Sequence, residues 1–123
     1  MYLFSFEKLE LWKDARSLAK MAYAITDSFP NSEKYGLMNQ MNRAAVSVAS
    51  NIAEGSARIK SKDKVRFLHI AFGSLMEFLN QLIIADDFGW VNQDQFITTR
   101  NQIEMIAKKI NALEKAWIKQ NNI

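Results

Sequence analysis

A row of polar side chains recurs at helical spacing near the middle of the chain. It comprises Arg43, Ser47, Asn51, Glu54 and Arg58, which share one helix face because residues three and four apart are neighbours. Serine and asparagine are mediocre helix formers, so a row of them suggests a hydrogen-bonded contact with another backbone or side chain. We interpret the row as a polar seam within or between subunits, with Glu54 paired to Arg58. A recognition site for a ligand or nucleic acid is the alternative, and the row gives little basis for catalysis.

A second group of side chains suits phosphate binding. Between Ser56 and Ile70 the only acid is Asp63, and the basic residues are Arg58, Lys60, Lys62, Lys64 and Arg66. Basic side chains at this density can neutralise nucleic-acid phosphates, and a solvated helix entrance is the alternative. A separate helix face carries three further candidates, Lys108, Lys115 and Lys119. No aromatic residue alternates with the lysines of the first group, so base stacking on single strands gains little support there.

Metal and nucleophile chemistry finds little support in the sequence. The chain has no cysteine, and its one histidine is His69. A di-iron bundle needs a Glu-x-x-His pair on each of two helices, but Arg66 stands three residues before His69. We therefore predict no catalytic, metal or cofactor site, and we expect His69 at an interface or on the surface.

Length and composition predict one helical domain. The chain has 123 residues, of which four are glycine and one is proline, and 49% are hydrophobic. So few turn residues leave little room for an all-β design. No apolar run approaches the roughly 20 residues that span a membrane. We expect a soluble cytoplasmic protein without a membrane contact.

The net charge of +3 conceals a segregation along the chain. The basic group lies between Ser56 and Ile70, whereas residues 71–99 contain no basic residue and four acids, Glu77, Asp86, Asp87 and Asp94. Because the chain turns in both regions, we expect a positive and a negative end of the molecule.

Apolar residues recur three and four positions apart in four segments, which is typical of amphipathic helices. The segments are about 7–28, 33–54, 62–86 and 93–119. The expected core row of the first is Leu11, Ala15, Leu18, Ala22, Ile25 and Phe29, and that of the fourth is Phe96, Ile103, Ile106, Ile110, Leu113 and Trp117. The connections are short, so consecutive helices should be antiparallel neighbours. The sequence thus predicts an all-α fold, an antiparallel up-down-up-down four-helix bundle.

Residues that stop or start helices mark the ends of these segments. Pro30 should end the first, and Gly55 and Gly89 should end the second and third. Asn92, with Gln95 three residues later, makes a capping box for the fourth.

The third segment is more apolar than one bundle needs. Val65, Leu68, Phe72, Leu75, Leu79 and Leu82 form its expected core row, and other apolar residues widen this face to about half the circumference. Gly73 lies in mid-helix at a cost of about 1 kcal/mol, which suggests that something packs closely there. We therefore expect copies of the chain to assemble. The candidate interface or seam residues are Arg43, Ser47, Asn51, Glu54, Ile70, Gly73, Glu77 and Ile84.

Two short motifs carry a resemblance to a known family. Arg43-Ala-Ala-Val-Ser47 and Asn51-Ile-Ala-Glu-Gly55, followed by Arg58, are similar to the signature of the bacterial four-helix bundle proteins first described as products of the intervening sequence in 23S ribosomal RNA genes. Supporting matches, in order, are Phe6, Glu7, Leu9, Trp12, Phe29-Pro30, residues 33–37, Gln40, Phe67-Leu68, Ala71, Gly73-Ser74 and Glu77. One departure is Ala49, where many members carry proline.

The resemblance implies a homo-oligomer, in this family a pentamer around a central channel. Its relatives include the accessory variability protein of diversity-generating retroelements, which resembles a basic pentamer that binds nucleic acid and a reverse transcriptase. The ribosomal label of many members reflects gene location.

These observations predict a non-enzymatic homo-oligomeric scaffold whose basic surface binds RNA or DNA. A protein partner, such as a reverse transcriptase, is a further candidate for binding. The alternative is a protein–protein adaptor, for example for a reverse transcriptase, without nucleic-acid contact. A small-molecule or enzymatic role in a channel is a third class, and it would need a cluster of perturbed ionisable groups that the sequence does not display.

Overall fold

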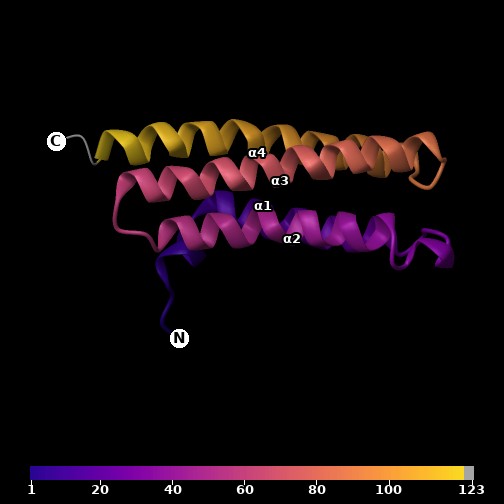
Figure 1. Cartoon of the computed structure of the whole chain (residues 1–123), viewed down its shortest axis with the longest axis horizontal. Coiled ribbons are helices and arrows are strands. Elements are labelled where there is room, and N and C mark those ends of the chain that lie inside the picture. The colour runs from indigo at the N-terminus through magenta and orange to yellow at the C-terminus, as the bar shows by residue number, and fades with distance from the viewer. Residues whose placement is uncertain (121–123) are drawn as a thin grey trace.

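The computed structural model describes residues 1–120, which form an all-helical structure. Within that range the α-helices are α1 (Glu10–Thr26), α2 (Leu37–Ser56), α3 (Ser61–Asp87) and α4 (Gln93–Gln120). Two short 3-10 helices, η1 (Ser5–Lys8) and η2 (Asn31–Glu33), precede α1 and α2. Successive helices run in opposite directions, as the up-down-up-down prediction requires (Figure 1).

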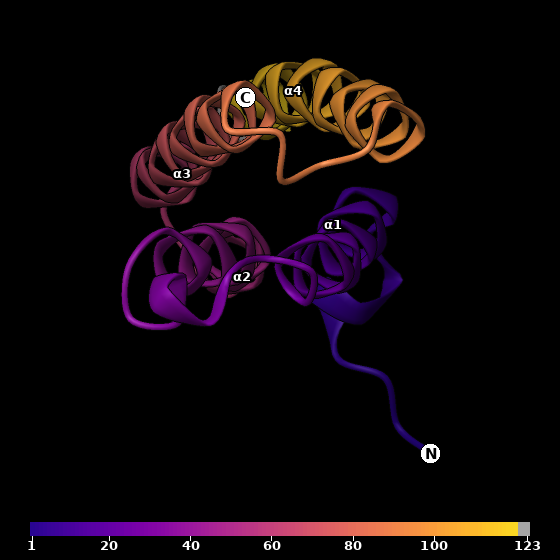
Figure 2. The same cartoon turned by 90° about the vertical axis from the view of Figure 1, so that its right-hand side faces the viewer.

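The helices surround one core, and each contacts the two beside it. Viewed along the bundle, α1 and α2 form one layer, and α3 and α4 form the other (Figure 2). The α2–α3 linker lies at the same end as the last turns of α4, and the α3–α4 turn lies at the opposite end (Figure 1). The basic linker and the acidic residues Asp86, Asp87 and Asp94 are therefore at opposite ends of the bundle.

The predicted core rows are correct for most helices. In α1 and the turn after it, the whole predicted row is buried: Leu11, Ala15, Leu18, Ala22, Ile25 and Phe29. In α3 the prediction is half right, because Leu68, Leu75 and Leu82 are buried but alternate with Ala71, Phe78 and Ala85. Phe72 and Leu79 of the predicted row are only partly buried. Apolar residues cover so much of α3 that a 3-4 repeat fits two adjacent registers.

Three predicted helix boundaries need correction. The first helix does not run unbroken from residue 7, because Leu9 is extended, with φ −74° and ψ 124°, and separates η1 from α1. The second helix begins at Leu37 rather than 33, since Gly36 adopts φ −110° and ψ −119° at its N-cap. Gly55 lies inside α2 and does not end it.

The last two helices agree closely with the expected ends. Gly89 follows α3 with φ +76°, a left-handed conformation that favours glycine. The Asn92 side chain accepts a hydrogen bond from the Gln95 backbone N–H at 2.8 Å, as expected for a helix start.

The helix α3 is also, by length and composition alone, long and apolar enough to span a membrane. Its mean hydropathy reaches 1.4 over the best window, of which 39% is buried inside the bundle. No such segment is expected from uninterrupted apolar runs, because single polar residues interrupt the run in α3. The core helix of a soluble protein meets the same criterion, and α3 supplies buried residues from Phe67 to Ala85.

Two glycines in the bundle have opposite surroundings. A Cβ atom at Gly55 would lie 3.0 Å from the Cβ of Phe67 and 3.2 Å from the backbone oxygen of Lys64, so α2 and α3 meet closely there. A Cβ atom at Gly73 would meet nothing within 4 Å. The expectation that something packs closely on Gly73 is therefore wrong within a single chain. That another copy of the chain packs there stays a prediction.

We expect Gly55→Ala to lower the free energy of unfolding by up to about 2 kcal/mol. Overpacking costs about 1–3 kcal/mol, and replacing a helical glycine with alanine recovers about 1 kcal/mol of that cost. Gly73→Ala is the matched control and should raise the stability of the unassembled chain by about 1 kcal/mol. Urea melts of dilute protein measure both changes. Equal gains in the two variants would contradict the close approach at Gly55.

Candidate nucleic-acid interface

The chain reverses direction between α2 and α3 through a tightly bonded linker. The backbone N–H of Ala57 donates to the Glu54 oxygen at 3.2 Å, and that of Arg58 donates to the Gly55 oxygen at 3.2 Å. These bonds close the last turn of α2, and α3 begins four residues later. Because the linker is short, it holds its basic side chains beside the first turns of α3.

Lys64 is the one predicted phosphate ligand that serves the fold directly. Its Nζ donates a hydrogen bond to the Ser56 backbone oxygen at 3.0 Å, at the end of α2 where carbonyl groups lack helical partners. The same ammonium lies 4.8 Å from the ring centre of Trp117 in α4. Burial at this position lowers the pKa of Lys64. Lys64 thus joins α2, α3 and α4 and presents less of its charge to a ligand.

Arg58 and Arg66 both lie against Phe67. Their guanidinium carbons are 4.6 and 4.8 Å from the Phe67 ring centre, within the range of a cation–π interaction. Phe67 itself is buried. Arg58 also contacts Glu54 at 3.3 Å, as the sequence predicted for residues four apart. The ring therefore fixes two cations beside the linker.

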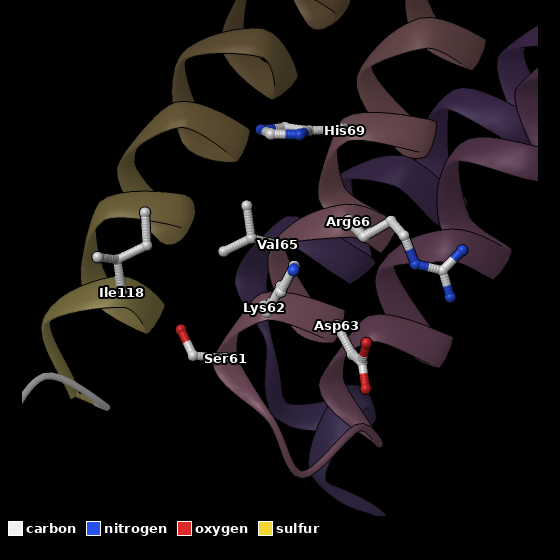
Figure 3. A pocket seen from close by; sticks show the side chains of 7 residues that line it. All are labelled: Ser61, Lys62, Asp63, Val65, Arg66, His69 and Ile118. Atoms are coloured by element: carbon white, nitrogen blue, oxygen red, sulfur yellow. The ribbon is translucent and has the colours of Figure 1, made fainter.

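A groove of about 760 Å³ runs over the first two turns of α3 towards the end of α4. Its lining residues are Ser61, Lys62, Asp63, Val65, Arg66, His69 and Ile118. Val65 and His69 point towards α4, where Ile118 lies, and Asp63 and Arg66 point towards α2 (Figure 3). Lys62 lies between these two sets. The groove thus combines an apolar floor with two cations.

A second, smaller hollow of about 300 Å³ lies beside the groove. Its lining residues are Ala57, Arg58, Ile59, Lys60 and Asp63. Asp63 lines both hollows, so they are adjacent. Ile59 is 91% exposed and lies among basic side chains.

Five lysines of the predicted phosphate-binding set are exposed and make no ion pair within residues 1–120. This group comprises Lys60 and Lys62 near the linker and Lys108, Lys115 and Lys119 on α4. The linker pair lies in the two hollows, whereas the α4 row does not line either one. The structure therefore brings four of the predicted residues together: Arg58, Lys60, Lys62 and Arg66.

The polar row of α2 makes contacts within the chain. The hydroxyl groups of Ser47 and Ser74 are 2.8 Å apart and join α2 to α3. The Asn51 amide donates to the Ser47 backbone oxygen at 2.8 Å and to its hydroxyl at 3.0 Å. These bonds suit a seam between two helices of one chain. Arg43 is exposed and has no ion pair within residues 1–120.

The outward side of α3 carries the other predicted interface residues. Ile70 and Ile84 are 41% and 37% exposed, and Met76 and Ile83 beside them are also exposed. Gly73 and Glu77 lie on the same side of the helix. We call Ile70, Gly73, Met76, Ile83 and Ile84 the α3 stripe.

Side chains suited to metal binding do not gather in the described part of the chain. Residues 1–120 contain no group of three or more His, Asp or Glu side chains that could hold an ion. His69 instead pairs with Glu114 and joins α3 to α4 at the surface.

Sequence reasoning missed the apolar members of the site. Val65 and Ile118 lie more than fifty positions apart in the sequence. They line the same groove because α3 and α4 are neighbours. Ser74 belongs to a motif of the family resemblance, but the sequence did not predict its hydrogen bond with Ser47. For the smaller hollow, the one sequence signal was an isoleucine, Ile59, between the basic residues Arg58 and Lys60.

We expect Lys64→Ala to destabilise the protein by about 1–2 kcal/mol, because a hydrogen bond from a charged donor and a cation–π contact are both lost. Lys60→Ala, which removes an exposed lysine, should change stability by less than about 0.5 kcal/mol. Chemical melts of both variants test this difference. Equal stability of the two variants would contradict a structural role for Lys64.

Comparison with a solved structure supports the same helical fold. A protein of unknown function from the S23 ribosomal protein family of Bacteroides thetaiotaomicron matches with a TM-score of 0.79 at 17% identity. The match covers 85% of this chain and 98% of that one. A search of curated proteins finds no significant match.

Comparison with family models gives a match over most of the chain. The family model described as 23S rRNA-intervening sequence protein matches residues 7–112. This range includes α1, α2 and α3, the linker residues that line the two hollows, and the α3 stripe. The resemblance seen in the Arg43–Arg58 motifs is thereby confirmed. The chain belongs to the 23S rRNA-intervening sequence protein family.

Proposed function

We propose that this protein is a homo-oligomeric binding scaffold, rather than an enzyme, whose basic end binds RNA or DNA in the cytoplasm. The observation that carries the proposal is the gathering of Arg58, Lys60, Lys62 and Arg66 around two adjacent hollows. Phosphate groups are the ligands that such a cluster suits best, and their neutralisation releases counterions from the nucleic acid.

The charge distribution supports this orientation of binding. The acids Asp86, Asp87 and Asp94 lie at the far end of the bundle (Figure 1). A nucleic acid would therefore be attracted to the linker end and repelled from the α3–α4 turn. This polarity favours end-on contact over binding along the length of the bundle.

The α3 stripe supports the assembly of several copies. Four large apolar side chains on one helix face are exposed in the single chain, although burial would stabilise each of them. Gly73 lies among them without a neighbour, and its missing side chain permits a close approach by another backbone. A ring of copies would place several basic ends side by side and strengthen their combined field.

A protein adaptor is the second candidate, because the α3 stripe and the exposed residues Met1, Tyr2, Leu3 and Phe4 also suit a protein partner. This reading predicts partner binding without affinity for nucleic acid.

We expect the double variant Lys62→Glu/Arg66→Glu to weaken nucleic-acid binding at least tenfold at low salt. It reverses two charges at the proposed phosphate-binding cluster. The number of counterions released on binding, which sets the salt dependence, should fall by about two. The control is Lys20→Glu/Lys34→Glu, which makes the same change in net charge away from the linker. Fluorescence anisotropy at two salt concentrations measures both. An equal loss in the two variants, or no binding by the native protein at low salt, would contradict the proposal.

We expect Ile70→Glu/Ile84→Glu to reduce the solution mass to that of a single chain, because charges replace apolar contacts between copies. Ile97→Glu, at another exposed isoleucine, should leave the mass unchanged. Light scattering measures the mass, and circular dichroism checks folding. A native protein that is folded and monomeric at micromolar concentration would remove the assembly from the proposal.

A further inference from the structure

We infer that the groove between α3 and α4 receives an unpaired base, so that the protein binds single-stranded nucleic acid in preference to duplex. This inference rests on the proposed nucleic-acid function and specifies its substrate class. It is carried by the apolar floor of the groove, which a purely electrostatic phosphate site does not need.

The floor consists of aliphatic side chains that approach from two helices. Val65 of α3 and Ile118 of α4 face the same space (Figure 3), and Ile118 is 40% exposed. The volume of about 760 Å³ lies within the range of about 300–1,000 Å³ that holds small organic ligands. A planar base can cover both side chains and remove their apolar surface from water. Phosphates and sugars alone would leave that surface exposed.

The cations lie where the strand's backbone would pass. Lys62 lies between the α4-facing and α2-facing sides of the groove, and Arg66 points towards α2 (Figure 3). Within residues 1–120 no carboxylate lies within ion-pair distance of either side chain. Arg66 is also held by its contact with Phe67. A base seated on Val65 and Ile118 therefore has phosphate ligands beside it on the crest of α3.

The smaller hollow continues the same path. It offers the cations Arg58 and Lys60 and the exposed aliphatic side chain of Ile59. The two hollows thus repeat one pattern, an apolar surface beside two cations, on either side of Asp63. A single strand with successive unpaired bases fits this repetition.

Duplex nucleic acid lacks the feature that the groove would bind. Its bases are paired and stacked, and extruding one costs unstacking energy. A duplex can therefore use the cations but not the apolar floor. Base stacking found little support in the sequence, because no aromatic residue alternates with the lysines. The structure supplies aliphatic surface from α4 instead.

The test compares a short unstructured oligonucleotide with its duplex by fluorescence anisotropy at low salt. The key variant is Val65→Ser/Ile118→Ser, which removes apolar floor without changing charge. We expect its affinity for the single strand to fall by about tenfold, because the apolar burial under the base is lost, and its affinity for the duplex to stay within about twofold. Ile97→Ser, at an exposed isoleucine of α4 outside the groove, is the matched control and should change neither.

The outcomes separate this inference from the function on which it rests. Equal affinity of the native protein for both forms, or an unchanged single-strand affinity in the floor variant, would overturn the inference while Lys62→Glu/Arg66→Glu still weakened binding. A floor variant whose solution mass falls would also overturn it, because the groove would then be a contact between copies. Circular dichroism confirms that each variant is folded. Failure of the function itself would appear as no binding of either form by the native protein.

Discussion

The close approach of α2 to α3 at Gly55 is the constraint on which the basic end depends. Gly55 has no side chain, so the last turn of α2 can lie against the Cβ of Phe67 and the backbone of Lys64. This contact brings the Lys64 ammonium within hydrogen-bond distance of the Ser56 carbonyl. It also positions Phe67 where both Arg58 and Arg66 can lie on its ring. A larger residue at position 55 would move these groups together, because they share one contact.

Two outward features of α3 do not serve the stability of a single chain, and the proposed assembly would account for both. Its inward side supplies buried residues to the core, while its outward side exposes the α3 stripe and keeps a glycine that costs about 1 kcal/mol. The glycine lowers the stability of an isolated bundle, and the exposed apolar side chains contribute no burial to it. Contact between copies would compensate for both at once, since it would bury the isoleucines and use the space at Gly73.

Periodicity and short connections predicted the helices and their antiparallel order, but they did not predict which side chains come together between helices. The rows of α1 and α4 were largely correct because each has one apolar face bounded by polar residues. In α3 the apolar arc is so wide that spacing alone did not distinguish Phe72 from Ala71 as the inward residue. The glycine at position 55 satisfied the rule for a helix stop, yet its role is close packing, which depends on the position of Phe67 in another helix. The groove depends on Val65 and Ile118 lining one hollow from two helices, and no local sequence pattern indicates that arrangement.

The placement of Lys64 changes how the basic group should be understood. Five basic residues close together in the sequence suggest one uniform patch. In the structure Lys64 is held against the end of α2 and the Trp117 ring, Arg58 and Arg66 are held by Phe67, and Lys60 and Lys62 extend from the surface. Burial lowers the pKa of Lys64 because the charged form loses water. Since the held arginines lose less side-chain freedom when a ligand binds, they would fix the path of a bound backbone, and the exposed lysines would add attraction with less geometric specificity.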